Sequence, residues 1–161
     1  MLQSQIDAAV HQALDKLLAE DGFRHYTGIQ CERLAAELSH RSGASQVLLC
    51  SSGTAAVELA LRAAGVGSGD EVLLSAYDYP GNFWAVERVG AKPLLADVEP
   101  GGWRLSVDQI SRAWDASPAP RLKAMVVSHL HGQLQPIPAL RRWCEGHGII
   151  LIEDACQALG A

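Results

Sequence analysis

From residue 47 onward, short apolar runs alternate with segments of helical pattern, and this alternation constrains the fold more than any other feature of the sequence. The expected strands lie at 47–50, 72–74, 93–97, 124–127 and 149–152, and the expected helices at 54–65, 80–89, 106–114 and 138–146. The strand cores are continuous apolar runs, which is typical of strands buried on both faces. The sequence therefore predicts an α/β fold with a mostly parallel sheet and helices on both faces.

Residues before position 47 follow a different pattern, so we divide the sequence into two parts. Residues 1–46 are an expected N-terminal helical segment, with amphipathic helices at 4–20 and 29–41. Residues 47–161 hold all of the expected strands. No covering element follows the expected strand at 149–152, so we expect the sheet to be incomplete in this chain.

Composition and charge argue against several classes of protein. The 161 residues carry 18 acidic and 13 basic side chains, a net charge of -5, with no Lys/Arg cluster, which argues against nucleic acid as the main partner. No apolar run is long enough to span a bilayer, and the N-terminus lacks the pattern of a signal peptide. The four cysteines form no CxxC pair. We therefore expect no zinc site and no disulfide framework, and a cytoplasmic location by default.

The helix expected at 54–65 is apolar almost all round, which predicts that it is largely buried. Its Glu58 and Arg62 have the i,i+4 spacing of an ion pair. The glycine-rich run from Gly65 to Gly69 follows this helix and precedes a strand, which is the reverse of the order in dinucleotide-binding folds. We therefore interpret that run as a tight turn.

Polar or aromatic side chains follow four of the expected strands. They lie at Ser51–Ala55, Tyr77–Tyr79, His129–His131 and Glu153–Asp154. Because the carboxyl ends of parallel strands meet at one edge of a sheet, we expect these groups to converge on one cleft. This convergence indicates a binding site more strongly than any single motif does.

Each of these groups has a second interpretation that the residues alone leave open. Gly53 and Thr54, at the start of a helix, form either a cradle for a phosphate group or an ordinary N-cap. Asp154 is either a functional acid or a helix cap, and Tyr79 either stacks on a flat ring or packs against its neighbours. His129 and the histidine two residues later share one side if the strand continues. Without a third ligand, we interpret them as cleft lining and not as a metal site.

Taken in order, these residues resemble the sugar aminotransferase group of fold-type I pyridoxal phosphate enzymes, the DegT/DnrJ/StrS family. The stretches that carry the resemblance are Tyr26–Gly28, Ser51–Ala56, Gly69–Val72, Val89–Pro93, His129–Gln133 and Glu153–Ala158. The resemblance covers nearly the whole chain but only the N-terminal half of the family's length. It implies that residues 47–161 are a partial large domain that binds pyridoxal 5'-phosphate (PLP).

The resemblance also implies how this cofactor is held. Gly53, Thr54 and Ala55 would bind its phosphate, which suits the free N–H groups of a helix N-terminus. Tyr79 matches the aromatic residue that stacks on the pyridine ring. No metal is implied.

Three further positions take roles at the ring through the same resemblance. Asp154 would pair with the pyridine nitrogen and keep it protonated, so that the ring accepts electrons. Gln157 would donate a hydrogen bond to the phenolic oxygen. His129 matches a histidine near the cofactor in many members, so Asp154 and His129 are the expected catalytic residues.

The sequence departs from the family at two places. Asp78 stands where many members carry a threonine, and the stretch Pro80–Asn82 that follows is unusual. The lysine that forms the Schiff base with the cofactor is absent. The chain's lysines are Lys16, Lys92 and Lys123, and none of them lies at the matching place.

The resemblance implies ping-pong transamination through the PLP and pyridoxamine phosphate (PMP) forms of the cofactor. The donor is usually glutamate or glutamine, and the acceptor is a keto-sugar or related ketone. Because the lysine is missing, we interpret the chain as the PLP-binding half of a split aminotransferase. A C-terminal-half polypeptide would supply the Schiff-base lysine in a dimer of such pairs, and the chain would be inactive without it. A non-catalytic subunit, a truncated fragment and a relative with sugar dehydratase chemistry are the open alternatives.

Overall fold

The structure is a computed structural model that describes residues 2–20, 27–117 and 121–160, with side chains from residue 5 onward. Tyr26 of the family-like early loop lies outside the described residues. The chain divides into two compact units, residues 1–49 and 50–161, and each is described by itself. Within the described ranges, no helix has the length and apolar character needed to cross a membrane.

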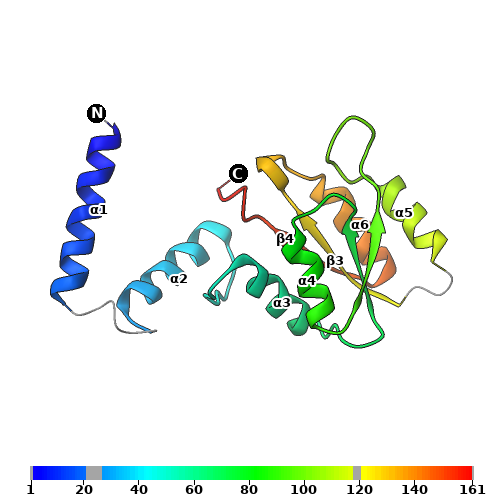
Figure 1. The fold of residues 1–161 in the computed structure, drawn as a ribbon, viewed down its shortest axis with the longest axis horizontal. Coiled ribbons are helices and arrows are strands. Elements are labelled where there is room, and N and C mark those ends of the chain that lie inside the picture. Colours follow the sequence, from blue (N-terminus) through cyan, green and yellow to red (C-terminus); the bar gives the residue numbers. More distant parts are fainter. Residues whose placement is uncertain (1, 21–26, 118–120, 161) are drawn as a thin grey trace. The chain divides into compact units, whose positions relative to one another are not determined.

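The first unit contains the two helices that the sequence predicted (Figure 1). They are α1 (Leu2–Ala19) and α2 (Ile29–Ser42). Helix α2 ends where Gly43 takes a left-handed conformation, with a φ of 71°, and donates a hydrogen bond to the Ser39 carbonyl. This is the usual way in which a glycine ends a helix.

The second unit contains a four-stranded parallel sheet with the order β2-β1-β3-β4. The strands are β1 (Glu71–Ser75), β2 (Lys92–Ala96), β3 (Leu122–Ser128) and β4 (Ile150–Asp154). The proline at position 93 lies on the edge strand β2, where its missing N–H is tolerated. The parallel sheet expected from the apolar runs is therefore confirmed.

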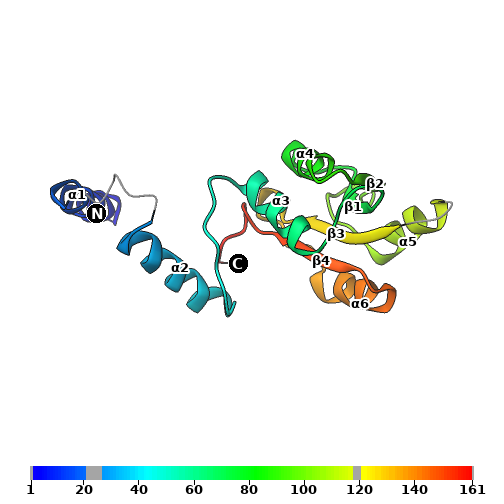
Figure 2. The ribbon, with the colours of Figure 1, turned by 90° about the horizontal axis from the view of Figure 1, so that it is seen from below.

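Four helices cover the two faces of this sheet (Figure 2). They are α3 (Gly53–Ala63) and α4 (Pro80–Arg88) on one face, and α5 (Val107–Ala116) and α6 (Ile137–His147) on the other. A 3-10 turn, η2 (Leu130–Gly132), follows β3. The prediction of helices on both faces is confirmed.

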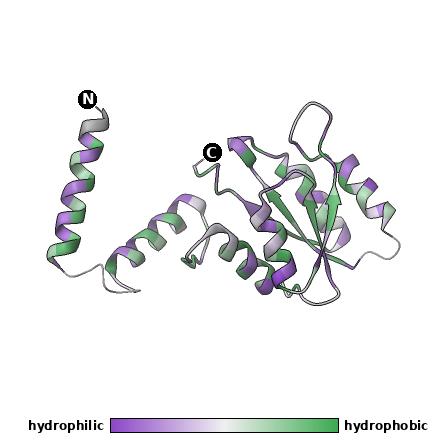
Figure 3. Cartoon of the chain, viewed as in Figure 1, coloured by the Kyte–Doolittle hydropathy of each residue, from purple (hydrophilic) through white to green (hydrophobic). Residues whose placement is uncertain are grey.

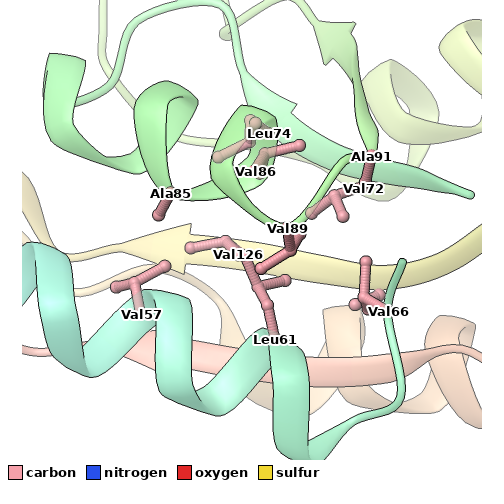
Figure 4. Packing of buried hydrophobic residues seen from close by; sticks show 11 residues of the cluster. Val57, Leu61, Val66, Val72, Leu74, Ala85, Val86, Val89, Ala91 and Val126 are labelled. Atoms are coloured by element: carbon pink, nitrogen blue, oxygen red, sulfur yellow. The ribbon is translucent and has the colours of Figure 1, made fainter. Parts of the chain in front are cut away.

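Successive side chains of the strands enter opposite core clusters, as the pleat of a strand requires. On β1, Val72 and Leu74 pack with helices α3 and α4, while Leu73 packs with α5 and α6. Figure 4 shows Leu61 of α3 and Val126 of β3 in the first cluster, and Figure 3 shows the hydrophobic strands at the centre of the unit. Burial on both faces explains why the strands are apolar without alternation.

Two details of the sequence prediction are wrong. The apolar run 47–50 is not a strand, because it pairs with none of the four strands of the sheet, and Leu48 is 76% exposed. Helix α3 is not buried all round, because the sheet and α4 cover only one of its faces. Val57 and Leu61 are buried there, while Leu59 is 42% exposed.

Two other details are confirmed. The turn at Gly65 to Gly69 is present, with left-handed φ angles at both of these glycines. The Glu58–Arg62 ion pair is also present, at 2.8 Å.

Helix α3 offers a matched test of this packing. Leu61→Ala removes a fully buried side chain and should lower the free energy of unfolding by about 2–5 kcal/mol. Leu59→Ala, on the exposed face of the same helix, should change it by less than about 1 kcal/mol. Denaturant unfolding of both variants measures the difference. Equal losses would contradict the one-sided packing of α3.

Candidate functional site

A pocket of about 240 Å³ lies where β3 and β4 end and helices α3 and α4 begin. Its lining residues are Ser52, Gly53, Thr54, Tyr79, Asn82, Ser128, His129, Leu130, Asp154, Cys156 and Gln157. All of them belong to the second unit. This is the rim of an open α/β sheet at which ligands bind in general.

One wall of the pocket is the N-terminus of α3. The Ser52 hydroxyl accepts a hydrogen bond from the Ala55 N–H at 3.1 Å, so it caps the helix. The N–H groups of Gly53 and Thr54, at the first two helical positions, have no partner in the described part of the chain. Together with the helix dipole they favour an anion here. Ala55 does not line the pocket, and its N–H donates to the Ser52 cap.

Another wall is formed by Asp154, the last residue of β4. Its Oδ1 accepts from the Cys156 N–H at 3.1 Å, and its Oδ2 accepts from the Asn82 amide at 3.1 Å. Burial acts to raise the pKa of this carboxyl, but hydrogen bonds from Cys156, Asn82 and Ser128 outweigh burial and hold the pKa below its ordinary value. Asp154 is therefore an anion at neutral pH.

A second carboxyl, that of Asp78, is joined to Asp154 through Asn82. The Asn82 amide nitrogen lies 3.1 Å from Asp78 Oδ1 and 2.9 Å from Ser128 Oγ, in addition to its bond with Asp154. Burial raises the pKa of Asp78, and the charge of Asp154 adds to the rise. Asp78 Oδ2 is buried and has no hydrogen-bond partner among the described residues. The rim thus holds two acids with pKa values displaced in opposite directions.

The close approach of Tyr79 to Thr54 depends on a glycine. A Cβ atom added at Gly81 would overlap the Tyr79 ring and would lie 2.5 Å from Thr54 Oγ1. Gly53 is similarly close to Cys156, whose Sγ would be 2.8 Å from an added Cβ. The aromatic ring and the hydroxyl therefore share the pocket wall because these two positions lack side chains.

Gln157 is held from outside the pocket by His131. The Gln157 Oε1 accepts a hydrogen bond from the His131 N–H at 2.5 Å, which leaves the amide nitrogen as the group that can donate to a ligand. His131 has a φ of 57°, which is strained for a residue other than glycine. Its ring nitrogen Nε2 lies 3.2 Å from the Tyr77 hydroxyl, and the Tyr77 ring stacks on Trp103.

His129 is buried, with 3% of its surface exposed, and both of its ring nitrogens are engaged. Nδ1 accepts a hydrogen bond from the Gln135 N–H at 3.0 Å, and Nε2 lies 3.2 Å from Glu153 Oε1. A neutral imidazole that accepts at Nδ1 carries its hydrogen on Nε2. The condition under which the two histidines would share one side is not met, because β3 ends at Ser128 and a 3-10 turn follows.

The pocket brings together most of the residues expected from the sequence. They are Gly53, Thr54, Tyr79, His129, Asp154 and Gln157. The roles assigned to them stay predictions, as does the role of Ala55. Sequence reasoning did not select Asn82, Ser128 or Cys156 as site residues. The sequence carried no helical-spacing signal for Asn82, because Asp78, its hydrogen-bond partner, lies before the N-cap of α4.

Comparisons with known proteins give a consistent result. The model of the DegT/DnrJ/EryC1/StrS aminotransferase family matches residues 4–161. A pleiotropic regulatory protein of Geobacillus stearothermophilus is 32% identical over 98% of this chain and 41% of its own length. The UDP-N-acetyl-3-dehydro-alpha-D-glucosamine 3-aminotransferase of Acidithiobacillus ferrooxidans is 35% identical over 92% of this chain and 38% of its own length.

A solved structure extends the comparison to the fold. NtdA of Bacillus subtilis, with bound cofactor PMP, matches with a TM-score of 0.84 and 28% identity, over 94% of this chain and 34% of that chain. The chain therefore spans about 40% of the length of the curated relatives that it matches. The resemblance stated from the motifs and the α/β fold class are confirmed.

Two glycines on helices provide a test of the close contact of Gly81 with Tyr79 and Thr54. Gly81→Ala should destabilise the protein by about 1–3 kcal/mol, because the new methyl group meets Tyr79 and Thr54. Gly146→Ala, on helix α6 with nothing within 4 Å, should stabilise it by about 0.5–1 kcal/mol through helix propensity. Thermal unfolding compares the two. A Gly81→Ala variant as stable as Gly146→Ala would contradict the described contact.

The Cys156 thiol provides a test of the charge at Asp154. A hydrogen bond to Asp154, with burial as a second cause, raises the pKa of Cys156 to about 11. At pH 8 about one thiol in a thousand is then ionised, so alkylation by iodoacetamide should be slow and should rise about tenfold per pH unit up to pH 11. Asp154→Asn should speed the reaction, and Asp115→Asn should not. Peptide mass spectrometry measures the rates, and fast alkylation of the unaltered chain at pH 8 would contradict the assignment.

Proposed function

Because the chain belongs to the DegT/DnrJ/EryC1/StrS aminotransferase family, we propose that its pocket holds PLP as the cofactor-binding half of an aminotransferase. The reaction would transfer an amino group from an amino acid to a keto-sugar or a related ketone. The Acidithiobacillus relative, a 3-aminotransferase of a UDP-linked dehydro-glucosamine, supports this class of acceptor. We assign cofactor binding to residues 47–161 and not to the segment 1–46, because every lining residue lies in the former.

The observation that carries the proposal is that one pocket presents an anion site and an uncompensated carboxylate. The N-terminus of α3 favours a phosphate group, while Asp154 is ionised without help from any basic side chain of the described residues. A half-buried carboxylate of this kind favours a cationic partner. The phosphate and the protonated ring nitrogen of PLP supply both charges. The residues present therefore fit this cofactor.

The remaining lining residues fit a flat ring between these two ends. We assign Tyr79, at the start of α4, to stack on the ring, and the Gln157 amide nitrogen to donate to its phenolic oxygen. His129 is held by its contacts with the Gln135 N–H and the Glu153 carboxylate, so we assign it to shape the wall beside the ring. Bound PLP would supply the electron sink for the amino transfer. The chain's own contribution is binding, orientation and the charge at Asp154.

We further propose that a partner polypeptide supplies the lysine that reacts with the cofactor. The chain's three lysines do not line the pocket. Lys92 begins β2, and Lys123 is the second residue of β3, with its Nζ 4.0 Å from Asp70 Oδ2. Both are at the amino ends of their strands, while the pocket is at the carboxyl ends. Such a lysine would provide the reactive amine and the proton transfers of the reaction.

The test combines cofactor binding with chemical trapping. The protein is isolated with the polypeptides that co-purify with it, PLP is added, and borohydride then fixes the cofactor to the lysine with which it has reacted. We expect the label on a lysine of a partner polypeptide. A label on Lys92 or Lys123 would contradict the proposed source of the lysine, as would a label on a later lysine of the same polypeptide. Absence of PLP binding would contradict the function itself.

The role of Asp154 has its own prediction. Asp154→Asn should fold normally but weaken PLP binding by about tenfold or more, since it removes the partner of a cationic nitrogen. Asp115→Asn, an exposed carboxylate on α5, should have no effect. Fluorescence titration with PLP measures both. An unchanged affinity of Asp154→Asn would remove Asp154 from the cofactor site.

A further inference from the structure

The side chain of Asn82 makes contacts that its helix does not need. Asn82 lies in the first turn of α4, where its backbone N–H already donates to the Tyr79 carbonyl. Its side chain takes no part in capping that helix. Instead its amide nitrogen reaches Asp78, Ser128 and Asp154 at 2.9–3.1 Å, and only 1% of the residue is exposed. A buried polar side chain with three acceptors is specified by its partners.

The two carboxyl groups that it joins have unequal surroundings. Asp154 receives N–H groups on both oxygens, from Cys156 and Asn82. Asp78 receives them only on Oδ1, from Asn82 and Tyr79, and its buried Oδ2 has no partner in the part of the chain that the structure describes. A carboxylate that receives hydrogen bonds on both oxygens is better stabilised than one that receives them on a single oxygen. Asp154 is therefore the better stabilised carboxylate of the pair.

We propose that Asn82 is a positioning residue that fixes the Asp154 carboxylate toward the pyridine nitrogen of PLP, and that Asp78 anchors the Asn82 amide. This inference rests on the proposed function above. The Asp78 oxygen that accepts from Asn82 is itself fixed by the Tyr79 N–H at 2.6 Å, so the amide has one orientation. Asp78 then takes one of the two amide hydrogens, and the other is directed toward Ser128 and Asp154. The position of the charge at the ring is thus determined by α4, and not by β4 alone.

The charged and titratable groups around this pair come from several elements. Asp78 precedes α4, Asp154 and Glu153 end β4, and Cys156 follows β4, while His129 follows β3. The Glu153 carboxylate lies within hydrogen-bond distance of His129 Nε2. The Cys156 thiol keeps its proton at neutral pH, because its pKa is raised to about 11. No cation joins them in the described ranges. A ligand cation is therefore the group that this arrangement lacks.

Two probes separate the effect at the ring nitrogen from effects elsewhere in the pocket. The first is PLP, and the second is its deaza analogue, in which a C–H group replaces the ring nitrogen while the phosphate and the ring remain. A residue that acts through Asp154 therefore strengthens the binding of PLP and not that of the deaza analogue, which has no ring nitrogen. The preference for PLP, defined as the ratio of the two dissociation constants, is measured by fluorescence titration of the isolated protein with its co-purifying polypeptides.

Asn82→Ala should lower the preference for PLP by about tenfold while the affinity for the deaza analogue stays the same. Asp78→Ala should lower it by about threefold, because the amide loses its anchor. Asp78→Asn keeps a carbonyl acceptor for Asn82 and should recover most of that loss. Gln12→Ala, an amide on the exposed surface of α1, is the matched control and should leave the preference unchanged.

The outcomes distinguish this inference from the proposed function. If the unaltered protein binds neither probe, the proposed function fails. If it prefers PLP and Asn82→Ala keeps the full preference, the positioning role fails. An equal loss for both probes would show a merely structural role and would also overturn it. Where Asn82→Ala does not fold, as judged by circular dichroism, the Asp78→Ala and Asp78→Asn pair decides, and equal preferences in the two would overturn the inference.

Discussion

The parallel pairing of β3 with β4 is the interaction on which the rest of the site depends. Its register places Ser128 beside Asp154, the last residues of the two strands. The backbone continues the pairing by one step, since the His129 N–H donates to the Asp154 carbonyl at 3.0 Å. Parallel strands of this length are stable only when helices cover both faces. The packing of α3 and α4 therefore both stabilises the sheet and places two helix N-termini at its rim.

This arrangement gives the pocket two chemically different sides. Helix α3 presents unpaired N–H groups, which favour an anion, and β4 presents a carboxylate, which favours a cation. Among the described residues, no acidic side chain binds the N–H groups of α3 and no basic side chain pairs with Asp154. A ligand with a phosphate at one end and a protonated nitrogen at the other complements both. The family is PLP-dependent, and the two sides of the pocket fit such a cofactor.

The sequence predicted the sheet and the helices well because their signals are local. Continuous apolar runs such as Val72–Leu74 are buried on both faces, and the helix expected at 106–114 is present as α5, capped by the Ser106 hydroxyl, which accepts from the Gln109 N–H. The run 47–50 carried the same signal and was misread, because a strand also needs a neighbour and apolar composition does not reveal one. The exposed face of α3 was missed for the same reason, since burial depends on what packs against a helix.

The candidate site was predictable where a motif fixes the backbone and unpredictable where side chains from distant segments meet. Gly53 and Asp154 follow from strand ends and helix starts. The bridge from Asn82 to Asp154 joins residues 72 positions apart, and only the folded sheet brings them within 3.1 Å. His131 was unpredictable for a local reason. Its left-handed backbone, at a φ of 57°, is unusual for a histidine, and no sequence pattern marks it.

The central claim is that Asp154 holds a protonated ring nitrogen in this pocket. The most direct measurement is the ¹⁵N NMR chemical shift of PLP labelled at the ring nitrogen and bound to the protein with its co-purifying polypeptides. We predict the shift of a protonated pyridine at neutral pH, and its loss in Asp154→Asn. A bound cofactor whose nitrogen shows the shift of a neutral pyridine in the unaltered protein would contradict this claim.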